Sequence, residues 1–305
     1  MKTLDLTLKN YLSNWYSNHR YMIKPSTYET HLIYIKIISR FDIAAVRVCE
    51  LDEDDMCKFV SDMVEDGLAQ STIRVILSTI RNPLTHEYER GRIDNPFRGV
   101  KIPPQSCVKK PKRKIEPYTA DEQERLIRVL RATSHDAAAA IILMLETGMR
   151  VGELLALEFE DVDFKNNTVR INKTLVCNNH RETYVSQGAK SETSNRIIPL
   201  SKRASATFLA LKSKNSAKGY WLDSEIGRMS YPTIRAHVKR LCKQAGIPHR
   251  GQHVFRHTFA TNLANKGVPI TIISRLLGHS NTEVTMRVYV SIFTVSMDDM
   301  RNAVQ

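Results

Sequence analysis

The first hundred residues repeat apolar side chains at spacings of three and four, the pattern of amphipathic helices. This pattern predicts helices over residues 6–19, 25–40, 52–66 and 71–91. Residues that favour helix ends flank them: Ser26, Asp52 and Ser71 at starts, and Gly67 and Gly91 at ends. Pro83 removes a backbone donor inside the fourth segment, so we expect a kink or break near Arg81. The pattern predicts a small bundle of four helices.

This periodicity stops at KIPPQSCVKKPKRKIEP, residues 101–117, which holds four prolines and six lysines or arginines. The composition predicts a basic interdomain linker over residues 103–116, between a helical domain (1–102) and a second domain (117–305). The basic residues expected to lie against phosphates are Lys109, Lys110, Lys112, Arg113 and Lys114 of the linker, with Arg74 and Arg81 of the fourth helix. Ordinary surface solvation is the alternative for each of them.

The second domain is predicted to be helical with an interruption of alternating segments. A capping box, Thr119 to Glu122, opens it. Helices are predicted over residues 120–133, 136–147, 149–164, 202–213, 230–245, 253–266, 270–277 and 282–289. Alternation predicts three strands of one antiparallel sheet over residues 168–172, 182–186 and 195–199. The expected fold is mainly α with a small antiparallel β-sheet (α+β).

Three side chains in the first half of this domain are candidates for a role in chemistry. Arg150 lies at the start of the helix predicted over 149–164, where free backbone N–H groups favour an anion. Glu153 follows one turn later, placed to hold the Arg150 side chain or to pair with a neighbouring helix. Lys190 lies in the turn before the third strand, and a lysine there is a titratable donor suited to protonating a leaving group. Turn lysines also serve solubility alone.

The charge and the cysteine content of the chain indicate its partners and its cellular compartment. The chain has 45 Lys and Arg against 32 Asp and Glu, a net charge of +13, which is the balance expected of a protein that meets a polyanion. Its five cysteines are odd in number and widely spaced, so no disulfide framework is expected and a reducing cytoplasm fits. The longest apolar run is far shorter than a membrane span requires, and we expect no membrane partner.

The densest group of reactive side chains comes late in the chain. His253 and Arg256 lie three apart at a predicted helix start, so both project from one face. His279 follows Gly278, a glycine suited to a left-handed cap that would turn the imidazole back toward the same point. Tyr289 comes ten residues later. Fixed donors for an anion, together with a hydroxyl that could attack it, indicate phosphate chemistry.

A zinc helix is the competing interpretation, because His253 and His257 are four residues apart. The metalloprotease helix requires Glu directly after the first histidine, and this chain has Val254. We therefore expect no zinc here, and because the sequence has neither a P-loop nor an acidic cluster for magnesium, we expect no metal and no cofactor.

The motifs occur in a definite order: Arg150 in TGMRVGEL, Lys190 in AKSETSNRIIPL, His253 and Arg256 in HVFRHTFAT, His279 in LLGHS and Tyr289 in VYV. In this order the chain resembles the tyrosine recombinase, or phage integrase, family, and looks most similar to integrases of temperate phages and conjugative transposons. The resemblance implies a core-binding (SAM-like) helical bundle over 1–102 and a tyrosine recombinase catalytic domain over 117–305, with a C-terminal tail from residue 291. Many such integrases carry a further N-terminal arm-binding domain, so this chain is either a two-domain recombinase or a shortened one.

The resemblance also implies a reaction. Tyr289 would attack the scissile phosphodiester, giving a 3′-phosphotyrosyl link and a free 5′-hydroxyl. The remaining implied roles are stabilisation of the phosphate by Arg150, Arg256 and His279, protonation of the leaving oxygen by Lys190, help at the tyrosine or the phosphate from His253, and support from Glu153 and His257. The covalent link conserves the bond energy, so neither ATP nor a metal ion would be needed.

The implied function is site-specific DNA recombination through a Holliday junction, integrating and excising a mobile element. The implied partners are double-stranded DNA, accessory excisionase or DNA-bending proteins, and other copies of the chain in a tetramer joined by exchange of the tail. A hairpin over 175–188 longer than that of host chromosome-dimer resolvases favours a mobile element. The alternatives are a catalytically inactive, recombinase-derived DNA-binding regulator and a type IB topoisomerase-like relaxer.

Overall fold

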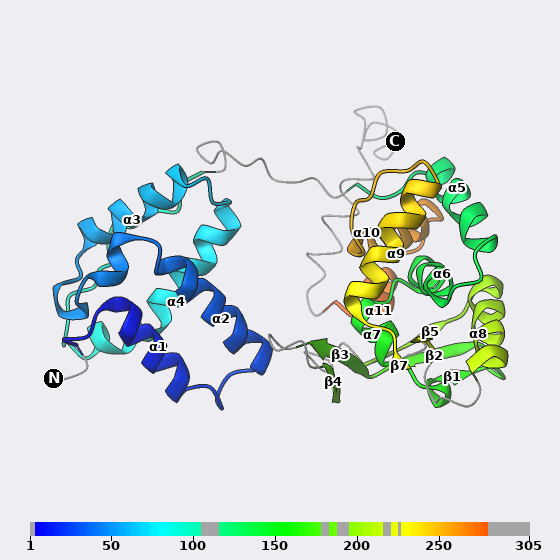
Figure 1. Ribbon diagram of the computed structural model, residues 1–305, viewed down its shortest axis with the longest axis horizontal. Coiled ribbons are helices and arrows are strands. Elements are labelled where there is room, and N and C mark those ends of the chain that lie inside the picture. Colours follow the sequence, from blue (N-terminus) through cyan, green and yellow to red (C-terminus); the bar gives the residue numbers. More distant parts are fainter. Residues whose placement is uncertain are drawn as a thin grey trace, which may run out of the picture. The chain divides into compact units, whose positions relative to one another are not determined.

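The computed structural model describes residues 4–104, 116–177, 183–187, 195–215, 221–224 and 227–279. These residues form two compact units, one within 4–104 and one within 116–279 (Figure 1). The fold is mainly α with small antiparallel sheets, as predicted. None of the described helices is long and apolar enough to cross a membrane.

The N-terminal unit is a helical bundle. Its helices are α1 (Leu8–Asn18), α2 (Pro25–Ile38), α3 (Glu53–Glu65) and α4 (Gln70–Glu89), with short 3₁₀ turns at Asp42–Ala45 and Val48–Glu50 between α2 and α3. Its core joins side chains of α1, α3 and α4, including Leu12, Phe59 and Ile76, each almost fully buried. The four-helix prediction is confirmed.

The predicted caps of this unit are partly wrong. Asp52 is the N-cap of α3, where its side chain accepts from the Asp55 N–H. The N-caps assigned to Ser26 and Ser71 are wrong, because α2 begins at Pro25, after Lys24, and α4 begins at Gln70, after Ala69. At α2 the fixed φ of proline favours the first helical position over a serine cap.

The kink or break expected near Arg81 does not take the form of a break, because α4 continues through Pro83. Proline has no N–H for the carbonyl four residues earlier, which belongs to Thr79. That carbonyl accepts instead from the Tyr16 hydroxyl of α1, at 3.0 Å. The Tyr11 hydroxyl, in turn, donates to the Pro83 carbonyl at 3.2 Å. The bond from Tyr16 of α1 therefore satisfies the carbonyl that the proline leaves without its helical donor.

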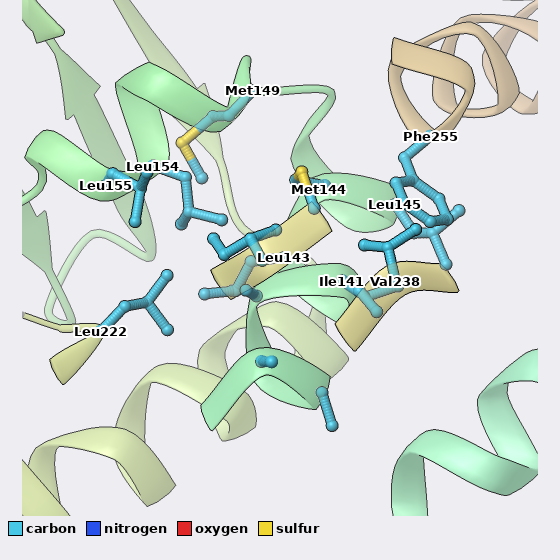
Figure 2. Close-up of a cluster of buried hydrophobic side chains, with 14 of the residues drawn as sticks. Ile141, Leu143, Met144, Leu145, Met149, Leu154, Leu155, Leu222, Val238 and Phe255 are labelled. Atoms are coloured by element: carbon cyan, nitrogen blue, oxygen red, sulfur yellow. The ribbon is translucent and has the colours of Figure 1, made fainter. Parts of the chain in front are cut away.

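The second unit is built around one very apolar helix. Its helices are α5 (Ala120–Arg131), α6 (Asp136–Thr147), α7 (Val151–Ala156), α8 (Lys202–Asn215), α9 (Tyr231–Gln244), α10 (His253–Asn265) and α11 (Ile270–Leu277). Figure 2 shows Ile141, Met144 and Leu145 of α6 among side chains of its neighbours, including Val238 of α9 and Phe255 of α10. The predicted capping box at Thr119 and Glu122 is confirmed. The helix predicted over 282–289 lies outside the described residues.

The helix predicted over 149–164 is too long. It ends at Ala156, and a 3₁₀ turn (Phe159–Asp161) and strand β1 (Val162–Asp163) follow. The Trp221 indole donates to the Glu158 carbonyl at 2.7 Å, and β1 pairs with β2. These tertiary contacts outweigh the helical pattern of LALEFEDVDF.

The strands form separate sheets and not the single sheet that was predicted. β2 (Thr168–Ile171) pairs with β1 and with β5 (Arg196–Pro199), whereas β3 (Lys173–Cys177) pairs with β4 (Thr183–Gln187). A two-residue pair, β6 (Asp223–Ser224) with β7 (Gly227–Arg228), was not predicted. The turns expected at Asn178/Asn179 and at 188–193 lie outside the described residues.

The chain leaves the β2 sheet at Lys173 because that side chain is buried between two carboxylates. Its Nζ is ion-paired with Glu158 and lies 3.0 Å from Asp161 Oδ2. β3 then packs on α7 at Gly152, where a Cβ would lie 2.1 Å from the Tyr231 hydroxyl and 2.9 Å from the Leu175 carbonyl. The close approach requires glycine, and it fixes the helix that follows Arg150 against the β3–β4 hairpin.

Candidate active site

The N-terminus of α7 holds the first predicted arginine. Arg150 is the N-cap of this helix, and its side chain is 38% exposed. Glu153, one turn later, accepts from the Arg150 backbone N–H at 2.9 Å and from Arg150 Nη1 at 2.7 Å. The N–H expected to be free for an anion is therefore taken by Glu153. The same carboxylate fixes the guanidinium at the helix start.

A second arginine, which the sequence analysis did not single out, binds the same carboxylate. Arg196 of β5 places Nη2 at 2.7 Å from Glu153 Oε2 and Nη1 at 3.2 Å from Oε1. Burial alone would raise the pKa of Glu153, but the bonds from Arg196 and Arg150 bring it below its ordinary value. Glu153 is thus a buried carboxylate shared by two arginines. The signal in the sequence was an arginine on an otherwise apolar strand, RIIP.

A third arginine ties α10 to two other elements. Arg256 is 7% exposed, and it donates from Nη1 to the Gly148 carbonyl at 2.9 Å and from Nη2 to the Leu277 carbonyl. The last carbonyls of a helix have no partner within it, and cations are favoured there. Arg256 therefore holds the turn before Arg150 and the end of α11 together.

His279 follows α11 as predicted. Gly278 caps this helix in the left-handed conformation, with φ of 64° and ψ of 48°, and the His279 N–H returns to the Ser274 carbonyl at 3.2 Å. The imidazole is half-buried. Its burial and the positive charges of Arg256, Arg150 and Arg196 lower the pKa of His279 to about 4.

The other histidines respond to the same charges. Partial burial, Arg256 and Arg150 lower the pKa of His253, and burial, His253 and Arg256 lower that of His257. Burial and the charges of Arg150 and Arg196 also lower the pKa of Arg256, although an arginine stays protonated at neutral pH. The cluster thus contains three guanidinium groups, one carboxylate and imidazoles held neutral. Such an arrangement favours an anion.

The structure brings together Arg150, Glu153, His253, Arg256, His257 and His279. Lys190 and Tyr289, with the linker residues Lys109, Lys110, Lys112, Arg113 and Lys114, lie outside the described residues. Arg74 and Arg81 are exposed on α4, seven residues apart, and the Arg81 guanidinium lies 4.7 Å from the centre of the Phe97 ring. Among the described residues, no group of three or more His, Cys, Asp or Glu side chains is arranged to hold a metal ion.

Comparison with known proteins identifies the family of the chain. Residues 117–294, more than half of the chain, match the phage integrase family. The chain belongs to this family. All the residues of the arginine and histidine cluster lie within the matched segment.

Relatives within the phage integrase family are distant. A tyrosine recombinase XerC-like protein of Caldanaerobacter subterraneus subsp. tengcongensis is 25% identical, over 94% of this chain and 80% of its own length. The transposase from transposon Tn916 of Enterococcus faecalis is 26% identical over 60% of this chain, and the match spans only 50% of that transposase. Among solved structures, the Tn1549 transposon integrase (residues 82–397) in complex with transposon right end DNA is similar with a TM-score of 0.85. It is 21% identical, and 98% of each chain is covered. This last similarity shows a shared fold.

Proposed function

We propose that the chain is a site-specific DNA recombinase that cleaves and rejoins DNA through a 3′-phosphotyrosyl intermediate. The observation that carries the proposal is the grouping of three arginines, Arg150, Arg196 and Arg256, with a single carboxylate, Glu153, which pairs with the first two. The excess of fixed positive charge suits a phosphodiester, whose negative charge must be stabilised as the nucleophile attacks. Membership of the phage integrase family supports the same reaction.

The proposed cleavage step exchanges one phosphate ester for another. The Tyr289 oxygen forms a bond to phosphorus as the bond to the 5′-oxygen breaks. The tyrosine proton passes to His253, whose lowered pKa makes it a neutral acceptor at pH 7. Lys190 gives a proton to the departing 5′-oxygen, and attack by a 5′-hydroxyl reverses the sequence. Because the phosphotyrosyl ester keeps the bond energy, the cycle requires neither ATP nor a metal ion.

The phosphate is held by the groups that the structure brings together. Arg150 and Arg256 are proposed to contact its non-bridging oxygens, and His279 to donate a hydrogen bond to one of them. Burial and the neighbouring positive charges keep His279 deprotonated in the free protein, and arrival of the anion offsets those charges. Glu153 and His257 support this arrangement from within the cluster.

In this proposal one unit binds DNA and the other carries the catalytic residues. Residues 1–102 form the core-binding domain, 103–116 the basic linker and 117–305 the catalytic domain. Arg74 and Arg81, exposed on α4, would contact phosphates together with the linker lysines and Arg113. Each phosphate neutralised in this way makes affinity more dependent on salt without adding sequence specificity.

The proposed context is a mobile element in a bacterial cytoplasm. The names of the Tn916 and Tn1549 proteins place those relatives in transposons, which favours integration and excision of such an element for this chain. Strand exchange through a Holliday junction requires four active sites. We therefore propose a tetramer joined by exchange of the tail from residue 291, with excisionase or DNA-bending proteins as accessory partners.

The test is covalent capture on a nicked duplex made from the ends of the element that carries the gene. Cleavage next to the nick releases a short strand and traps the protein–DNA adduct, which a denaturing gel resolves. Wild type should give an adduct, and Tyr289→Phe should bind the same duplex without one. Binding without an adduct by wild type would establish the regulator alternative. An adduct with DNA relaxation but no recombinant joints would establish the topoisomerase-like one.

A further inference from the structure

Arg196 is the cation of the cluster that faces the protein and not the solvent. Its side chain is only 5% exposed, and each of its three guanidinium nitrogens has a protein acceptor. Nη1 and Nη2 bind the Glu153 carboxylate, and Nε donates to the Leu276 carbonyl at 2.7 Å. A group so engaged is placed to position other groups.

The Glu153 carboxylate connects Arg196 to Arg150. Glu153 Oε1 accepts from Nη1 of both arginines, and Oε2 accepts from Arg196 Nη2 and from the Arg150 backbone N–H. Both oxygens of the carboxylate are therefore shared. The direction of the Arg150 guanidinium depends on where Arg196 holds Glu153.

The end of α11 connects Arg196 to His279. The Leu276 carbonyl is one of the last of α11, two residues before the cap at Gly278. The Arg196 guanidinium lies against this cap, since a Cβ on Gly278 would be 3.0 Å from Nη1 and 3.1 Å from Cδ. Arg196 thus contacts the turn that directs His279.

We propose that Arg196 is a positioning residue that holds Arg150, through Glu153, and His279, through the end of α11, in one geometry around the phosphate. This inference rests on the proposed function. An arginine is required because its planar fork gives two parallel bonds to a carboxylate while Nε serves a carbonyl, whereas a lysine ammonium is a single point donor.

The main variant is Arg196→Lys, which keeps the charge and loses the fork. Its matched control is Arg203→Lys, the same exchange at another arginine of this unit, whose partner, Glu146 at 2.8 Å, lies outside the cluster. Both variants are measured by thermal melting, affinity for the intact duplex, and single-turnover cleavage of the nicked duplex per folded molecule.

Arg196→Lys should bind DNA as wild type does and cleave about 100-fold more slowly, the effect expected of an ångström-scale misplacement of reacting groups. Arg203→Lys should bind and cleave the duplex as wild type does, per folded molecule. Combining Arg196→Lys with His279→Gln should cost less than the product of the single effects, because the histidine is already displaced. Wild-type cleavage by Arg196→Lys, or independent effects in the double variant, overturns the proposal.

A second measurement needs no DNA. The imidazole signals of His279, assigned with His279→Gln, are titrated by NMR in wild type and in Arg196→Met. Loss of the neighbouring positive charge should raise the pKa of His279, and an unchanged titration overturns the contact on which the proposal depends. If wild type fails to form an adduct, the proposed function fails while this titration still decides the placement of Arg196.

Discussion

Arg256 donates a hydrogen bond of 2.9 Å from Nη1 to the carbonyl oxygen of Gly148. Gly148 ends α6 in the left-handed conformation, two residues before Arg150. The start of α10 is therefore attached to the turn that presents the other proposed phosphate ligand. Through Leu277 the same guanidinium also holds the end of α11.

Arg256→Lys should reduce single-turnover cleavage by about 100-fold or more, because a lysine cannot reach both carbonyls and contact the phosphate at once. The measurement is adduct formation on the nicked duplex. Arg203→Lys is the control, since Arg203 is a partly exposed arginine of the same unit, paired with Glu146 at 2.8 Å. Equal activity of the two variants would contradict the role assigned to Arg256.

The free protein should lose stability as the pH falls through the range in which His279 is held neutral. Its pKa lies at about 4 in the folded chain against an ordinary value of 6.5. Between these values the unfolded chain binds a proton that the folded chain does not, so the stabilisation is complete above 6.5 and is lost toward 4. His253 and His257 shift in the same direction and add to the effect.

The corresponding measurement is the melting temperature of DNA-free protein at about pH 7.5 and about pH 5. Wild type should lose more on acidification than His279→Gln, which has no imidazole to protonate at this position. The same loss in both proteins would show that the arginines do not control the protonation of His279.

Tyr16→Phe should weaken α4 locally by about 1–3 kcal/mol, because it leaves the buried Thr79 carbonyl without a donor. Pro83→Ala supplies an N–H four residues after that carbonyl. In the Pro83→Ala background, Tyr16→Phe should therefore cost less. Hydrogen exchange of the α4 amides measures the destabilisation caused by Tyr16→Phe in each of the two backgrounds. An equal destabilisation in both would rule out this explanation of the unbroken helix.

Local patterns predicted much of the fold and part of the site. The spacing of His253 and Arg256, and the glycine before His279, predicted positions that depend on a single helix and its cap. The box at Thr119 and Glu122 is likewise local. Such features follow from backbone geometry within a few residues, so one sequence is enough to find them.

The wrong or missing predictions concern features that depend on contacts between distant segments of the chain. Pro83 stays helical because Tyr16, 67 positions earlier, donates to the backbone that it leaves open. β3 was missed because Lys173, a charged residue by pattern, is buried between two carboxylates. Arg196 was overlooked because its partner, Glu153, is 43 residues away. Each depends on a contact between distant segments, which periodicity does not report.

The charge imbalance around Glu153 has a cost for the free protein. Of three guanidinium groups, Arg150 and Arg196 share the one carboxylate, and burial with the neighbouring charges lowers the pKa of the third, Arg256. A cluster of this kind opposes folding through self-repulsion, and it is relieved when an anion enters. In the proposed function the missing negative charge belongs to DNA. The positive charge of the cluster is therefore balanced only when DNA is bound. The free protein is less stable because of this charge, and the same charge increases its affinity for DNA.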